Sequence, residues 1–114
     1  MFRVISLNAN GIRAAARKGF FDWMAAQNAD VVCIQETKAW PEQVDFSEIE
    51  KLGYHHYWET AEKKGYSGVC VLTKQEPDLV VNGMNIPEYD TEGRIIRADY
   101  GDLSILNCYF PSGT

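Results

Sequence analysis

VISLNANGIR, residues 4–13, ends an apolar run abruptly in two asparagines, a glycine and an arginine. Residues 2–8 predict a buried strand, and residues 18–28 carry apolar side chains at positions 20, 21, 24 and 25, the spacing of one helical face. The unbroken apolar run in ADVVCIQE, residues 29–36, predicts a second strand covered on both sides. Strand, helix and strand in this order predict parallel neighbouring strands with a right-handed crossover.

The rest of the chain predicts antiparallel strands. Residues 54–59 and 67–74 read as strands joined by the polar loop TAEKKGY, residues 60–66. Residues 93–100 and 102–110 flank a tight turn at Gly101 and Asp102, which predicts a hairpin. In its last strand, residues 103, 105, 107 and 109 would share one face. With only one convincing helix, we expect a single sheet that needs further covering.

Composition predicts one folded domain over residues 1–114, because 46% of the residues are hydrophobic. Without an apolar run near ~20 residues or the order of a signal peptide, we expect no membrane segment and a cytoplasmic location. Three cysteines without a C-x-x-C pair fit buried reduced thiols. The net charge of −5 argues against indiscriminate nucleic-acid binding but allows a local basic patch.

Polar residues stand where three apolar strands end, and each has an ordinary interpretation beside a functional one. Asn8 and Asn10 are typical turn formers, and Tyr109 fits a core aromatic with a satisfied hydroxyl. Glu36 could be a solvated strand end or a helix cap, but a carboxylate beside a buried strand is costly unless it is paired or binds a cation. A hard cation such as Mg²⁺ prefers such oxygen ligands.

Two further stretches stay open at this point. The loop EKKGYSG could contact phosphate through its backbone or be a plain hairpin loop. His55 and His56, among aromatic neighbours, are expected to be packed or surface imidazoles and not catalytic groups.

The segments LNANGIRA, VVCIQETK, EKKGYSGV, EGRIIRADY and NCYFPSG, in this order and spacing, closely resemble the exonuclease III family of AP endonucleases, within the endonuclease/exonuclease/phosphatase superfamily. The resemblance runs from Val4 to Gly113. It implies an α/β fold, one half of a four-layer α/β sandwich, with a mixed β-sheet, a flanking helix and an apolar inner sheet face. It also implies a DNA-repair hydrolase that uses Mg²⁺ or Mn²⁺ to cut duplex DNA at abasic sites and to degrade 3′ ends.

The resemblance assigns roles to individual residues. Glu36 would be the metal-binding carboxylate, and Asn10 at most a weak ligand, because some members carry an acid there. Asn8 would bind the scissile phosphate or orient the catalytic groups, and the Tyr109 hydroxyl would also bind that phosphate. The residues that match DNA-backbone contacts are Arg13, Ala14, Lys18, Gly65 and Tyr66.

Family members run to roughly twice this length, and their second half supplies an Asp-x-Asn pair, a further aspartate and an Asp-His pair. We therefore expect the chain to be an N-terminal half-domain with little or no nuclease activity alone. Its inner sheet face would be covered by the missing C-terminal half or by a second copy. The alternatives are a non-catalytic, self-associating half-domain with residual DNA-backbone binding, and a phospholipid or nucleotide phosphatase, which the basic and aromatic loop disfavours.

Overall fold

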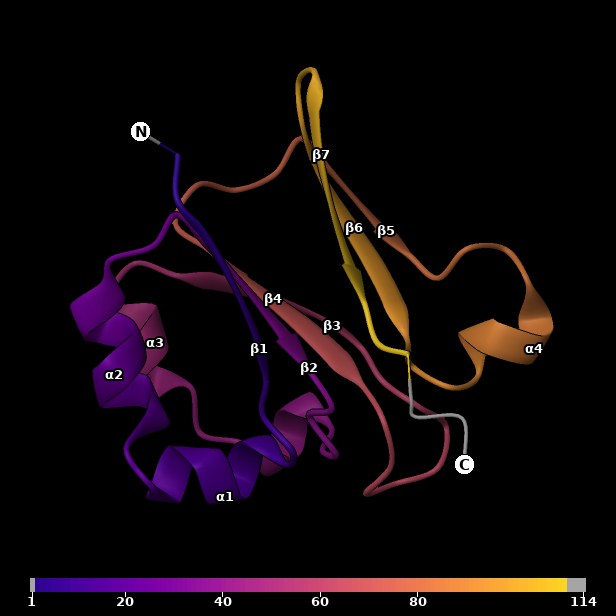
Figure 1. The fold of residues 1–114 in the computed structure, drawn as a ribbon, viewed down its shortest axis with the longest axis horizontal. Coiled ribbons are helices and arrows are strands. Elements are labelled where there is room, and N and C mark those ends of the chain that lie inside the picture. Colours follow the sequence, from indigo (N-terminus) through magenta and orange to yellow (C-terminus); the bar gives the residue numbers. More distant parts are fainter. Residues whose placement is uncertain (1, 111–114) are drawn as a thin grey trace.

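The computed structural model describes residues 2–110, apart from the side chain of Tyr89. Residues 111–113 of the family-like segment NCYFPSG lie outside this range. The elements are β1 (Val4–Asn8), α1 (Ile12–Arg17), α2 (Phe20–Gln27), β2 (Val31–Gln35), the 3₁₀ turn η1 (Pro41–Gln43), α3 (Ser47–Lys51), β3 (His55–Glu59), β4 (Val69–Thr73), β5 (Leu79–Asn82), α4 (Pro87–Asp90), β6 (Ile95–Tyr100) and β7 (Leu103–Cys108) (Figure 1).

The first sheet has the strand order β1-β2-β4-β3. As predicted, β1 and β2 are parallel, with Val4 opposite Val31 and Asn8 opposite Gln35. β4 runs antiparallel to β2 and β3. Helices α1, α2 and α3 lie together on one side of this sheet (Figure 1). On that side the core is built from helical and strand residues that include Ile12, Met24, Ile34, Ile49 and Leu72.

The second sheet has the order β5-β6-β7 and packs against the other face of the first sheet. The predicted hairpin is confirmed, because β6 and β7 are antiparallel and joined at residues 101–102. The predicted alternation also holds, with Asn107 1% exposed and Leu106 57% exposed. A shared core of Val31, Cys33, Val69, Val71, Ile96 and Ile105 joins the two sheets.

This arrangement confirms the α/β class and the apolar inner face but corrects the expectation of a single sheet with that face open. The hairpin joins β5 in a sheet of its own and covers most of the inner face over β2 and β4. Apolar side chains that stay exposed lie elsewhere: Val4 on the edge strand β1 is 47% exposed, and Leu106 and Phe110 are 57% and 79% exposed. Leu106 and Phe110 line a hollow of about 410 Å³ with Met84 and Ile95.

The predicted helix is present as α2, but the expectation of only one helix is wrong. α1 begins after Gly11, whose φ of 99° suits glycine, and its IRAAAR sequence buries only Ile12. α3 likewise buries only Ile49. Helices this short carry too few apolar residues to show a helical period. None of the helices in the described range is long and apolar enough to cross a membrane.

All three cysteines are free thiols. Cys33 and Cys70 are buried, as predicted, whereas Cys108 is half-buried on β7. Burial raises the pKa of Cys33 to about 11, so this thiol stays protonated at neutral pH.

Candidate functional site

The site begins where β1 and β2 end side by side. Because these strands are parallel, Asn8 lies beside Gln35 and Glu36 follows at the same edge. The Asn8 Nδ2 donates to Glu36 Oε1 at 3.2 Å, and Asn8 Oδ1 accepts from the backbone N–H of Asn10 at 2.9 Å. One amide thus orients the carboxylate and also forms the turn that leads into α1.

Lys38 holds both residues predicted as metal ligands. Its Nζ lies 3.1 Å from Glu36 Oε2 and donates to Asn10 Oδ1 at 2.8 Å. The Lys38 hydrogen bond, followed by those from Asn8 and Tyr109, lowers the pKa of Glu36. Glu36 is therefore an anion at neutral pH. Together with the Asn10 oxygen, it contacts one positive charge, the Lys38 ammonium.

The backbone that carries these groups is strained. Asn10, Glu36 and Lys38 have φ angles of 46°, 56° and 51°, in the left-handed region that non-glycine residues seldom adopt. The strained segment is held on both sides, since Gly11 N–H donates to Glu36 O at 2.8 Å and Lys38 N–H donates to Ser67 O at 2.8 Å. Strain that the surroundings enforce in this way is typical of functional sites.

Asn107 fixes the second sheet to this edge of the first. It is 1% exposed, and its Nδ2 donates to Ile34 O at 3.1 Å and to Cys70 O at 2.9 Å. Its Oδ1 accepts from Gln35 Nε2 at 2.8 Å. Three hydrogen bonds therefore set the position of β7 over β2 and β4, and with it the position of Tyr109.

Tyr109 follows β7 and faces Glu36 from the second sheet. Its backbone N–H donates to Arg94 O at 2.8 Å, which holds the residue beside β6. Burial, and then the neighbouring Glu36 carboxylate, raises the pKa of the Tyr109 hydroxyl. The hydroxyl consequently keeps its proton at neutral pH, and Glu36 is its hydrogen-bond acceptor.

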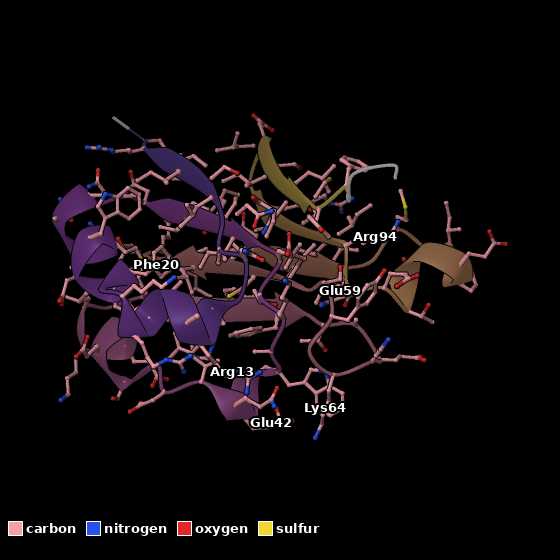
Figure 2. The ribbon with its side chains drawn as sticks, turned by 60° about the horizontal axis from the view of Figure 1, so that its bottom comes forward. Arg13, Phe20, Glu42, Glu59, Lys64 and Arg94 are labelled. Carbon is pink, nitrogen blue, oxygen red and sulfur yellow. The ribbon has the colours of Figure 1, made fainter. Side chains whose placement is uncertain are left out.

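The Glu36 corner is the group formed by Glu36 and its neighbours Asn8, Asn10, Lys38 and Tyr109. A cationic groove of about 420 Å³ runs beside it. Its walls come from α1 and from the β3–β4 loop, and the lining residues are Gly11, Arg13, Ala14, Arg17, Lys38 and Gly65. Three predicted DNA contacts, Arg13, Ala14 and Gly65, thus share one groove. Figure 2 shows Arg13 on α1 and Lys64 on the loop along the lower part of the molecule.

The other two predicted DNA contacts lie outside this groove. Lys18 lines a separate hollow of about 380 Å³ with Asn8, Asn10 and Trp23, and this hollow shares only Ala14 with the groove. Tyr66 is 38% exposed on the β3–β4 loop, and Lys63 Nζ lies 5.8 Å from the centre of its ring.

The structure adds residues that the sequence did not single out for the site. One of them is Lys38, whose contact with Glu36 depends on a left-handed turn that no local residue type signals. His56, as expected, is not part of the site: its ring stacks on Phe46 at 4.8 Å and accepts from the indole of Trp58.

The donor set fits part of a hard-metal site. Glu36 and Asn10 offer oxygen atoms, the ligands that Mg²⁺ and Mn²⁺ prefer, and both already contact the Lys38 ammonium. Within residues 2–110 no group of three or more His, Cys, Asp or Glu side chains is placed to hold a metal ion. Glu36 and Asn10 would therefore provide at most one corner of a metal site.

A family model described as "Endonuclease/Exonuclease/phosphatase family" matches residues 5–112. The chain belongs to this family. An exodeoxyribonuclease of Bacillus subtilis (strain 168) is 41% identical over 111 residues, which are 96% of this chain and 43% of that protein. A DNA-(apurinic or apyrimidinic site) endonuclease of Dictyostelium discoideum is 36% identical over 110 residues, 96% of this chain and 30% of its own length.

Solved structures agree with this membership. An AP endonuclease from Archaeoglobus fulgidus superposes with a TM-score of 0.82 at 28% identity, over 97% of this chain and 42% of that one. The resemblance to the exonuclease III and AP endonuclease branch is thereby confirmed, and so is the half-domain fold. The chain spans less than half the length of each of these relatives.

Proposed function

We propose that this chain provides the Glu36 corner of a DNA-repair phosphodiesterase of the exonuclease III and AP endonuclease type. Such an enzyme cuts duplex DNA at abasic sites and removes nucleotides from 3′ ends with Mg²⁺ or Mn²⁺. The observation that carries the proposal is an ionised Glu36, oriented by Asn8, faced by Tyr109 and adjoining a groove with three lining cations. The names of the relatives support DNA as the substrate.

The residues divide the work by their chemistry. Arg13 and Arg17 bind the negatively charged backbone along the groove, in the manner of sequence-independent phosphate contacts. Glu36 and the Asn10 oxygen would hold the divalent cation, which would stabilise negative charge on the phosphoryl oxygens. The protonated hydroxyl of Tyr109 would exchange its hydrogen bond to Glu36 for one to a phosphate oxygen, and Asn8 keeps the carboxylate in position.

The part of the site described here is incomplete for hydrolysis. Across residues 2–110, Glu36 is the only carboxylate in the contact network of Asn8, Asn10, Lys38 and Tyr109, and it is committed to cation binding. A site without its acid–base partner loses about 10²–10⁴-fold in rate. We therefore infer that the chain alone is a very slow nuclease, and that a C-terminal half or a second copy completes it.

The surface for such a partner differs from the one expected from sequence. The second sheet covers most of the inner face, so the open positions are the edge strand β1 and the outer face of β6 and β7. A partner that adds strands to β1 and covers Leu106 and Phe110 would bury the exposed apolar side chains.

Cleavage of a labelled duplex with a single abasic site, with protein in excess, tests the proposed function. We expect slow cutting that EDTA abolishes, that Glu36→Gln removes and that the matched control Glu42→Gln keeps. Glu42→Gln makes the same chemical change as Glu36→Gln, but at an exposed residue on η1 outside the Glu36 corner. Cutting that resists EDTA or survives Glu36→Gln would contradict the proposal.

The alternative is a non-catalytic, self-associating half-domain that keeps affinity for the DNA backbone. It is favoured by the incomplete metal corner and by the exposed Leu106 and Phe110. Sedimentation equilibrium separates the two: a stable dimer that binds duplex DNA but shows no metal-dependent cutting would support the alternative.

A further inference from the structure

The β3–β4 loop, residues 60–66, contributes Gly65 to the wall of the groove, and Lys63 and Lys64 precede Gly65 in the chain. Residues 62–66 of this loop are exposed, and Gly65 has a φ of 75°. An exposed loop of lysine and glycine has many accessible conformations, so a phosphate contact from Lys64 is costly in entropy unless the loop is held.

Trp40 makes two contacts that hold this loop. Its indole Nε1 donates to Ala61 O at 3.0 Å, and the Lys64 Nζ lies 4.7 Å from the centre of its ring. The first contact holds the start of the loop, together with the Glu62 N–H that donates to Thr91 O at 3.0 Å, and the second is a cation–π interaction near its tip. Trp40 therefore joins the segment after β2 to the start of the exposed stretch and to Lys64 in its middle.

Trp40 is itself held firmly. Its backbone N–H donates to Gln43 Oε1 at 2.8 Å, and Gln43 N–H donates to Trp40 O at 2.9 Å. Pro41 follows directly and restricts the Trp40 backbone to the extended conformation that it has, with φ −94° and ψ 155°. The ring is thus presented from a fixed turn and not from a mobile segment.

We propose that Trp40 is a positioning residue for the DNA backbone: it keeps Lys64 and Gly65 beside the groove formed with α1. The inference rests on the proposed function, because it names how one wall of that binding surface is ordered. A lysine over an aromatic face still directs N–H groups away from the ring, so Lys64 can donate to a phosphate while the contact with Trp40 persists. No lining residue of the groove is acidic, so the groove does not compete with phosphate for Lys64.

The salt dependence of binding to a short fluorescent duplex in EDTA tests this role, because the slope of log K against log salt changes by about 0.9 per phosphate contact. We expect Lys64→Gln to make the slope shallower by about 0.9, the equivalent of one contact. Trp40→Leu should reproduce that change, and combining the two should add nothing further. Phe2→Leu is the matched control, since Phe2 is 43% exposed before β1 and its ring packs against Tyr100.

The possible results separate this role from the proposed function. If the unsubstituted chain binds duplex but Trp40→Leu keeps its slope, or if the two substitutions act additively, the Trp40 role is overturned alone. If the unsubstituted chain does not bind at low salt, the groove itself is contradicted and both proposals fail. If circular dichroism shows that Trp40→Leu is unfolded, Trp40→Phe replaces it in the test. This variant keeps an aromatic ring but loses the hydrogen bond to Ala61 O, so its salt slope should lie between those of the unsubstituted chain and Lys64→Gln. Any other slope overturns the role of Trp40.

Discussion

Replacing Asn107 with alanine removes the hydrogen bonds that join the two sheets beneath the Glu36 corner. In the native chain, Asn107 Nδ2 satisfies the carbonyls of Ile34 and Cys70, and its Oδ1 accepts from Gln35. The residue is 1% exposed, so water cannot readily replace these partners. We expect Asn107→Ala to be among the most destabilising single substitutions in the chain.

The magnitude follows from the three contacts. A typical hydrogen bond contributes about 0.5–1.5 kcal/mol net, and a buried group left unpaired costs about 1–3 kcal/mol. Gln35 is half-buried and also donates to Ser6 Oγ at 3.0 Å, so the loss of its bond to Asn107 costs the least free energy. The two carbonyls that lose their donor account for most of the cost. A loss of about 2–4 kcal/mol in the free energy of unfolding is therefore expected, against a typical total of about 5–15 kcal/mol.

Urea denaturation followed by circular dichroism measures this loss. Asn82→Ala is the matched control, because Asn82 on β5 also donates across the sheets, to Trp58 O at 2.7 Å, but is exposed to water. Its loss should stay below about 1 kcal/mol. If Asn107→Ala costs no more than Asn82→Ala, burial does not decide the strength of these contacts, and the account of how β7 is positioned is wrong.

Other predictions concern the carboxylate and the turn beside it. Lys38→Met should raise the pKa of Glu36 in a carboxyl NMR titration, since the Lys38 contact is the main cause of its depression, and an unchanged pKa would refute this. In the unsubstituted chain the ion pair contributes stability that is fully present above the ordinary pKa of a glutamate and is lost as pH falls through the depressed pKa of Glu36. Gly68→Ala should lower the free energy of unfolding by about 1–3 kcal/mol in urea denaturation, because Gly68 has a φ of 91° and the new Cβ would lie 2.3 Å from Thr37 Oγ1. A neutral effect would show that this turn has room for a side chain. Thr37→Val should be neutral or stabilising by thermal melting, because the buried Thr37 hydroxyl has no hydrogen-bond partner, and a loss above about 1 kcal/mol would mean that it has one.

The parts of the fold that could be predicted from the sequence are those governed by local periodicity. The apolar run of β2 and the helical spacing of α2 predict the parallel β1–β2 pair, and the alternation in β7 places Asn107 inward. The assignment of β6 and β7 to a separate sheet could not be predicted, because a hairpin pattern does not say which strands lie beside it. β5 has only four residues, too few for a clear period.

The candidate site divides in the same way. The sequence marks Asn8 and Glu36 as polar residues where apolar strands end, and the structure brings them into contact at 3.2 Å because the two strands are parallel. The Lys38 contact depends on left-handed backbone at Glu36 and Lys38, residue types that give no sign of such a turn. The roles of Glu36, Asn8 and Tyr109 in metal and phosphate binding remain predictions that the structure supports by proximity.

The measurement that tests the central claim most directly is Mn²⁺ titration of the ¹⁵N-labelled chain by NMR. Paramagnetic broadening should first affect the side-chain amides of Asn8 and Asn10, and Glu36→Gln should abolish it while Glu42→Gln leaves it intact. Broadening centred elsewhere, or unchanged in Glu36→Gln, would contradict the assignment of this corner to a divalent cation.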